Sequence, residues 1–291
     1  MKKTILQTLS GGYDSTWLLI KNLKEGHDIY PIYIHSSSVN PIKQVIEFNS
    51  VKIIIDKLQS RFDNLHNLTE VEVNLETVSN VISMQPIFWM LGLFNEIKNN
   101  CKYMEHDEVN IGYIMQDSAV SYMKEIQNFW KALFSFSFPE YKTPKLKFPL
   151  IKYQKTAIIN ELKMFDYEIF EKCWFCEKPT IIKTKKLKDG NIESYIEACG
   201  ECNPCTRIKN INNHEFNKVK KYKTVLRFND FINALNKTIR KNSSKMIWLN
   251  ESHDFMTVEE IDEKTIKKLE RFKETEKPSK ILKHKKRPPK H

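Results

Sequence analysis

The 291-residue sequence contains only 7 glycines, and two of them are adjacent near the start of the chain, at Gly11 and Gly12. The sequence lacks any run of 18 or more apolar residues, which excludes a membrane-spanning helix. The apolar run after the first lysines is short and no small-residue cleavage site follows it, which excludes a secretory signal. Hydrophobic residues make up 41% and charged residues 29%, values that exclude a largely disordered chain. We therefore expect a folded, cytoplasmic protein.

Acidic residues are in deficit, with 36 Asp and Glu against 47 Lys and Arg, so the net charge is +11. Much of the excess lies in the C-terminal segment KETEKPSKILKHKKRPPKH. Such a tail can attract nucleic acid, and it is equally typical of a solvated terminus. We expect any nucleic-acid contact to use this tail. No feature fixes the oligomeric state, and a homodimer remains one alternative.

Strand-like and helix-like patterns alternate over the first half of the chain. This alternation predicts βαβ units and an α/β fold, a parallel sheet with helices on both faces, over a nucleotide-binding domain at 1–150. The predicted strands span 4–9, 29–38, 69–76 and 107–117, and the predicted helices span 14–26, 42–62, 82–100 and 118–136.

The pattern changes after residue 150. A helical pattern over 152–165 precedes a cysteine-rich segment over 173–205, and further helical patterns cover 227–241 and 257–273. We predict a helical metal-binding region at 151–212 and a helical C-terminal extension with the basic tail at 213–291.

The paired glycines lie in SGGYDST, between the first predicted strand and its helix. A glycine turn at this position in an α/β fold lets backbone N–H groups approach a phosphate without interference from a Cβ atom. The hydroxyls of Ser10, Ser15 and Thr16 add donors, and Asp14 is suited to capping the helix or to holding Mg²⁺. Neither G-x-x-x-x-G-K-[ST] nor G-x-G-x-x-G is present, which excludes the two commonest phosphate motifs.

SGGYDST resembles the SGGxDS loop of the PP-loop ATPases, the N-type ATP pyrophosphatases, which cleave ATP between the α- and β-phosphates and adenylate a substrate oxygen. This family includes asparagine and GMP synthetases, tRNA thiolation enzymes and the deazaguanine-nitrile synthases called QueC. The resemblance implies an ATP site with the following pyrophosphate-binding residues: Ser10, Gly11, Gly12, Asp14 and Ser15.

Cysteines cluster between residues 173 and 205, and two C-x-x-C units about twenty residues apart suit a four-thiolate zinc site. Five cysteines compete for four ligand positions, so either Cys173 or Cys176 is a spare; the other three are Cys199, Cys202 and Cys205. A ferredoxin-type iron–sulfur run would need a cysteine where Lys209 stands. The isolated Cys101 is expected to be a packed thiol.

The KCW and CGECNPCTRIK segments resemble QueC. A QueC segment similar to FPLIKYQKTAIINEL lies at the active site, and this similarity implies that Lys155 is an active-site residue. A second QueC segment is similar to VNIGYIMQD, and it implies that Gly112 and Asp117 lie near the substrate. The resemblance implies a ligase that uses ATP, Mg²⁺ and ammonia to convert a 7-carboxy-7-deazaguanine substrate into 7-cyano-7-deazaguanine, as in queuosine biosynthesis. It also implies a structural zinc and these catalytic residues: Asp14, Ser15, Lys155 and Asp117.

The chain departs from QueC after Asp117, where SAVSYMKEIQNF replaces the family's YPDCR-like stretch. Ser118, Ser121, Tyr122 and Gln127 offer other contacts for an acceptor. The alternatives are therefore a QueC-like paralogue that activates a nucleic acid or a protein, related to DNA modification or phage defence, or a PP-loop tRNA-modifying enzyme.

Overall fold

The computed structural model describes residues 2–36, 40–73, 85–189, 191–211, 221–226, 248–249 and 255–256. The helices predicted over 227–241 and 257–273, and the basic tail, lie outside the described residues.

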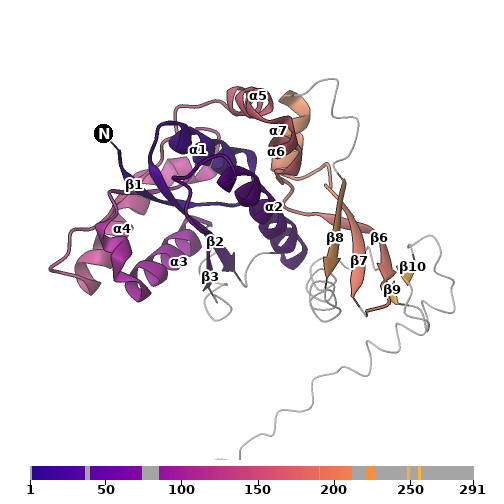
Figure 1. Ribbon diagram of the computed structural model, residues 1–291, viewed down its shortest axis with the longest axis horizontal. Helices are drawn as coiled ribbons and strands as arrows, with labels where there is room; N and C mark the ends of the chain where they lie inside the picture. Colours follow the sequence, from indigo (N-terminus) through magenta and orange to yellow (C-terminus); the bar gives the residue numbers. More distant parts are fainter. Residues whose placement is uncertain are drawn as a thin grey trace, which may run out of the picture.

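A five-stranded parallel sheet forms the centre of the N-terminal half (Figure 1). The strands lie in the order β3-β2-β1-β4-β5, and every neighbouring pair is parallel. The predicted parallel α/β fold is therefore confirmed. Of the five strands of this sheet, the three-residue edge strand β5 was not predicted from the sequence. The strands are β1 (Thr4–Thr8), β2 (Asp28–Ser36), β3 (Thr69–Val73), β4 (Glu108–Asn110) and β5 (Lys145–Lys147).

The helices between these strands begin and end close to the predicted positions. Helix α2 has a clear start signal, because the Asn40 side chain accepts hydrogen bonds from the N–H groups of Ile42 and Lys43, and Pro41 occupies the first turn. The helices are α1 (Tyr13–Lys24), α2 (Pro41–Gln59), α3 (Gln85–Asn99) and α4 (Met123–Ser137), with 3-10 helices η1 (Cys101–Glu105) and η2 (Ser118–Tyr122).

Helices pack on both faces of the sheet, because successive strand residues point to opposite sides. Ile5 of β1 is buried in a cluster with residues of α1 and α2, whereas Leu6 is buried in a second cluster with residues of α3 and α4. The chain from β1 to β3 builds one half of the sheet and then crosses to β4. Ligands of open α/β sheets bind where the strand order reverses in this way, here at the carboxyl ends of β1 and β4.

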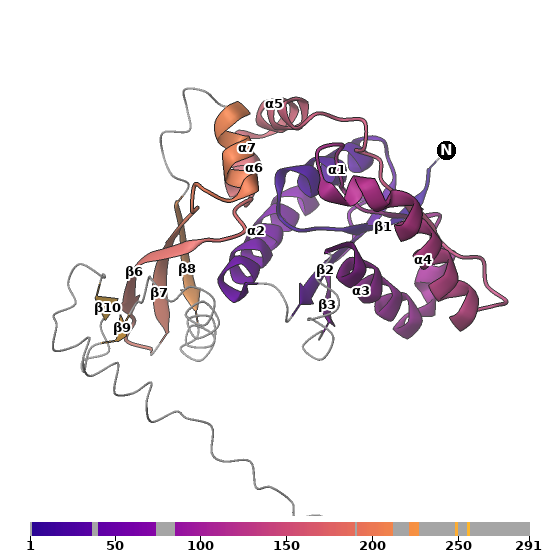
Figure 2. The ribbon, with the colours of Figure 1, turned by 180° about the vertical axis from the view of Figure 1, so that it is seen from behind.

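The region predicted to be helical over 151–212 contains helices and also a hairpin that the sequence analysis missed. Strands β6 and β7 pair antiparallel, and β8, which lies within the predicted helical extension, adds to β7. Figures 1 and 2 place this second sheet beyond α2, on the side of the molecule away from α4. The elements are α5 (Lys155–Phe165), α6 (Tyr167–Lys172), β6 (Thr180–Lys186), β7 (Ile192–Glu197), α7 (Asn203–Ile211) and β8 (Lys221–Leu226).

Two further short strands, β9 (Trp248–Leu249) and β10 (Phe255–Met256), pair antiparallel with each other. Among the described residues, the structure contains no helix of the length and apolar character that a membrane crossing requires.

Trp130 anchors α4 to the sheet and provides a test of the fold. It is 1% exposed, and its indole N–H donates to the Pro144 carbonyl at 2.8 Å. We expect Trp130→Ala to lower the free energy of unfolding by about 3–5 kcal/mol in chemical denaturation. Phe129→Ala, next to it on the same helix but 42% exposed, should change this free energy by no more than about 0.5 kcal/mol. Equal losses in both variants would contradict the described packing of α4.

Candidate functional site

The SGGYDST loop joins β1 to α1 at the carboxyl end of β1, where the strand order reverses. Gly11 has φ +69°, a conformation that side chains rarely adopt. Gly12 is the N-cap of α1 and supplies no side-chain cap, so the predicted capping role of Asp14 is wrong. The amides of the first helical turn therefore face a glycine loop, an arrangement that can bind an anion.

Two serine hydroxyls maintain the shape of the loop. The hydroxyls of Ser10 and Ser15 lie 3.0 Å apart, and Ser15 Oγ also accepts from the Ser10 N–H at 3.2 Å. Ser15 Oγ donates in turn to the Gly12 carbonyl at 3.3 Å. Thr16 lies in the interior, 0% exposed, and its N–H donates to the Gly12 carbonyl at 3.1 Å. Direct phosphate contacts of these three side chains remain predictions.

Asp14 and Lys155 form an ion pair beside the loop, with Lys155 Nζ 2.5 Å from Asp14 Oδ2. The other carboxylate oxygen, Oδ1, is buried and has no hydrogen-bond partner among the described residues. Burial raises the pKa of Asp14, an effect that Lys155 and Arg207 oppose and that the charge of Asp117 reinforces. Asp14 thus has one oxygen on a cation and a second oxygen free for another ligand.

The segment after β4 lies directly against the loop. A Cβ atom on Gly112 would stand 3.2 Å from both the Cα and the N of Ser15, so this position fits glycine closely. Asp117 ends the same segment, where its Oδ2 accepts from the Ile114 N–H at 2.9 Å. Its Oδ1 pairs with Arg207 Nη1 at 3.2 Å. The predicted residues Gly112 and Asp117 are therefore close to the loop, and Arg207 lies beside Asp117.

Arg207 and Trp174 are the site residues that the sequence analysis left out of its candidate set. Both stand in the QueC-like segments, Trp174 as the aromatic after a cysteine and Arg207 two residues after the last cysteine, so the signal was present. The N–H of Trp174 donates to the Gly11 carbonyl at 2.8 Å. A Cβ on Gly12 would lie 3.4 Å from the Trp174 carbonyl.

Four of the five predicted cysteines converge: Cys176, Cys199, Cys202 and Cys205. Their sulfur atoms all lie within 4.8 Å of one another: Cys176 is 3.6 Å from Cys199 and 3.9 Å from Cys202, and Cys199 is 4.0 Å from Cys205. A tetrahedral zinc with Zn–S bonds of about 2.3 Å requires sulfur atoms about 3.8 Å apart. The cluster therefore could hold one metal ion of this size.

Cys173 lies outside this cluster. Its thiol donates to the Ile169 carbonyl at 3.4 Å, and its side chain is fully buried in the core beside α1. The structure thus assigns the spare position, which the spacing left open, to Cys173. Cys101 has no described side-chain surroundings, so its expected role as a packed thiol remains a prediction.

The backbone around the cluster favours thiolates. The N–H of Cys199 donates to Cys176 Sγ at 3.2 Å, and the N–H of Cys202 donates to Cys199 Sγ at 3.3 Å. A hydrogen bond with the Cys205 side chain lowers the pKa of Cys176 to about 6, whereas burial raises the pKa of Cys202 and the hydrogen bond with Cys176 raises that of Cys205. Gly200 supplies the tight turn with φ +74°. Because the thiolate is the form that binds metal, this turn is suited to a metal knuckle.

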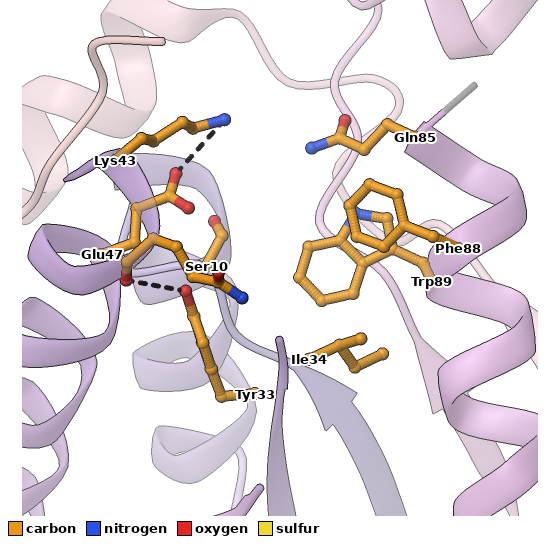
Figure 3. Close-up of a pocket in the computed structure, with 9 residues that line it drawn as sticks. Ser10, Tyr33, Ile34, Lys43, Glu47, Gln85, Phe88 and Trp89 are labelled. Atoms are coloured by element: carbon orange, nitrogen blue, oxygen red, sulfur yellow. Dashed lines mark hydrogen bonds and ion pairs between the residues drawn. The ribbon is translucent and has the colours of Figure 1, made fainter. Parts of the chain in front are cut away.

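A pocket opens between α2 and α3 and includes Ser10 of the loop in its lining (Figure 3). One wall carries Lys43 and Glu47, whose charged atoms are 3.6 Å apart, and the other carries Phe88 and Trp89. Burial raises the pKa of Glu47 to about 6 although Lys43 opposes the shift. This pocket could not be predicted from the sequence, because a Lys–Glu pair four residues apart is ordinary on an exposed helix.

The acceptor contacts suggested for the segment after Asp117 do not line this pocket. Ser118, Ser121, Tyr122 and Gln127 are all exposed, on η2 and α4.

No protein family and no curated protein matches the sequence. The fold is similar to the U34-tRNA thiolase NcsA from Methanococcus maripaludis with its [4Fe-4S] cluster (TM-score 0.34, 17% identity, 57% of this chain and 58% of that one). It is also similar to a 4-thiouridine synthetase in an RNA complex with bound ATP (0.40, 16%, 77% and 55%) and to the NMN synthetase from Francisella tularensis (0.30, 14%, 58% and 65%). The matches thus span less than two thirds of each of these three chains.

The cysteine assignment gives a matched pair of variants. Cys176→Ala should abolish stoichiometric metal binding, because three thiolates leave the shell incomplete. Cys173→Ala should keep one metal per chain and lose only packing, seen as a modest drop in unfolding temperature. Metal content by plasma mass spectrometry decides between them. Retention of metal in Cys176→Ala, or its loss in Cys173→Ala, would contradict the assignment.

Proposed function

We propose that the chain is a PP-loop ATP pyrophosphatase of the QueC type, which activates a carboxylate on a deazaguanine-like substrate with ATP and converts it with ammonia. One observation supports this most: the QueC-like segments, spread over the sequence, meet at one loop. Three residues from separate segments meet the loop: Lys155 pairs with Asp14 of the loop, Gly112 packs against Ser15 of the loop, and Arg207 pairs with Asp117 of the Gly112 segment.

A carboxylate must be activated before ammonia can react with it, because oxide is a very poor leaving group. Attack of the carboxylate oxygen on the α-phosphorus of ATP forms a C–O–P bond and releases pyrophosphate, which gives the carbonyl a better leaving group. Ammonia then displaces AMP and leaves an amide. The amide oxygen then attacks the α-phosphorus of a second ATP and releases a second pyrophosphate, and the O-adenylated amide loses AMP and two protons to give the nitrile.

The residues of the loop account for the first step. The α1 amides and Lys155 would bind the departing pyrophosphate and stabilise its charge. Asp14 Oδ1, buried and unpaired among the described residues, is the oxygen best placed to hold Mg²⁺, whose role is charge neutralisation. The four-cysteine cluster would hold a structural zinc, since four thiolates leave no open coordination position.

The pocket between α2 and α3 is the proposed acceptor site. A flat heterocycle would stack on Trp89 and Phe88, Glu47 would accept from ring N–H groups, and Lys43 would donate to a ring carbonyl. This edge pattern is that of a guanine-type ring. Incubation with ATP, Mg²⁺, ammonium and 7-carboxy-7-deazaguanine, followed by mass spectrometry of the products, tests the substrate directly.

A PP-loop tRNA-modifying enzyme is the second candidate, since four cysteines are also the ligands of a [4Fe–4S] cluster. Such a cluster places irons and sulfides between the cysteine sulfurs, whereas the present sulfurs are close enough to surround a single ion. Metal analysis separates the two: one zinc in a colourless protein supports the QueC type, and a brown iron protein supports the alternative. A QueC-like paralogue with a nucleic-acid or protein acceptor would release pyrophosphate only when that acceptor is added.

The loop assignment predicts the effect of removing the Asp14–Lys155 pair. Asp14→Asn and Lys155→Met should each lower pyrophosphate release by about 100-fold or more, because each removes charge beside the phosphates. Lys57→Met removes a lysine that pairs with Glu168, away from the loop, and should retain wild-type turnover. Unchanged turnover in both loop variants would refute the assignment.

The acceptor site predicts a pH dependence. The raised pKa of Glu47, about 6, means that its carboxylate becomes protonated as the pH falls through 6 and can then no longer accept two ring N–H groups. The dissociation constant of 7-carboxy-7-deazaguanine, measured by calorimetry, should therefore rise below pH 6 in the wild type. Glu47→Gln should bind weakly at all values between pH 5 and 8. If the dissociation constant of Glu47→Gln changed with pH in the same way as that of the wild type, Glu47 would not be part of the acceptor site.

A further inference from the structure

Two separate sets of contacts connect the cysteine cluster to the glycine loop. The first involves Trp174: its backbone N–H donates to the Gly11 carbonyl at 2.8 Å, and its indole N–H donates to the carbonyl of the cluster residue Cys176 at 2.9 Å. A single residue therefore contacts both the loop and the metal shell.

The second set of contacts involves Arg207 on α7. This helix also carries Cys205 of the cluster, two residues earlier. Arg207 pairs with Asp117 at 3.2 Å and donates through Nη2 to the Gln116 carbonyl at 3.0 Å. The guanidinium thus holds the end of the segment that begins at Gly112, the residue packed against Ser15 of the loop.

Helix α7 has only 9 residues, and isolated helices of that length are marginal in water. Its position depends on the buried Ile208 and on Cys205 at its N-terminal end. An ion bound by the four thiolates would fix that end, and with it Arg207. The loop and the cluster are therefore mechanically joined on two sides, by Trp174 and by Arg207.

We infer that Arg207 is a positioning residue that couples the four-cysteine metal site to the phosphate loop, so that a metal ion in the knuckle favours pyrophosphate binding at the loop. Coupling between two sites is reciprocal, so pyrophosphate at the loop must tighten metal binding by the same free energy. Because changes in affinity appear mostly in the dissociation rate, we expect this tighter binding to be seen as slower metal release. This inference rests on the proposed phosphate-binding loop and adds a residue and a linkage to it.

Metal release provides a readout that does not depend on catalysis. Zinc-loaded, full-length protein is mixed with excess metallochromic chelator, with and without saturating Mg²⁺-pyrophosphate. In the wild type, we expect pyrophosphate to slow zinc release at least about 5-fold, the lower end of usual coupling. In Arg207→Ala, which keeps all four cysteines, the slowing should fall below about 2-fold, whereas Arg207→Lys should lie in between because it keeps the charge but not the two-pronged contact.

A matched control removes another arginine of the same kind. Arg61 pairs with Asp166 at 2.6 Å, away from the loop and the cluster, and Arg61→Ala should show the wild-type slowing. If Arg207→Ala fails to fold, Asp117→Asn tests the same contact from the other side and should also reduce the slowing.

The outcomes separate this inference from the proposed function. Calorimetry first establishes whether wild-type protein binds Mg²⁺-pyrophosphate; absence of binding would overturn both the loop assignment and the coupling. Binding without any change in zinc release overturns the coupling and leaves the proposed function intact. If pyrophosphate slows zinc release equally in the wild type and in Arg207→Ala, the proposed role of Arg207 is overturned. If this effect of pyrophosphate is lost in the Arg207 and Asp117 variants and kept in Arg61→Ala, the proposed role is supported.

Discussion

Gly11 has no room for a Cβ atom, and the surrounding elements are arranged around this constraint. A Cβ on Gly11 would lie 2.8 Å from the Glu47 carbonyl of α2, in addition to the penalty of its positive φ. On the other side, the backbone N–H of Trp174 donates to the Gly11 carbonyl. Because the backbone of the loop touches the backbone of its neighbours, its shape is set by elements rather than by mobile side chains. Such rigidity suits a site that must present N–H groups to an anion.

The charges at the loop are paired before any ligand arrives. Lys155 lies on Asp14 and Arg207 lies on Asp117, and all four groups are partly shielded from water. In the proposed reaction, a polyphosphate would exchange one anionic partner of these cations for another, so that little new desolvation is needed. The carboxylates released by that exchange have the chemistry to hold Mg²⁺. The pairing therefore preorganises the cations for an anion, and the desolvation of the paired charges lowers the folding stability modestly.

The sequence predicted the parallel sheet and its helices because long apolar runs alternate with amphipathic ones, and it predicted the loop because rare glycines stood in that setting. It missed β6 because lysines in IIKTKK mask the alternation of a strand. It could not choose between Cys173 and Cys176, since both suit the spacing and only the packing of Cys173 in the core separates them. The half-buried Lys43–Glu47 pair could not be predicted, because its shielding depends on a segment distant in sequence that brings Glu177 close to it.

The hairpin between Cys176 and Cys199 connects the cysteine cluster to the helix that lines the proposed acceptor pocket. Its strands contribute Ile181 and Ile196 to a cluster that also contains Ile42 of α2. Both ends of the hairpin are held by the cysteine cluster, and added loop length raises the entropy of closure only slowly, so a longer hairpin leaves the metal shell intact. Because the same helix places Lys43 and Glu47 in the pocket, changes in the hairpin that shift α2 would alter acceptor recognition without touching the phosphate loop.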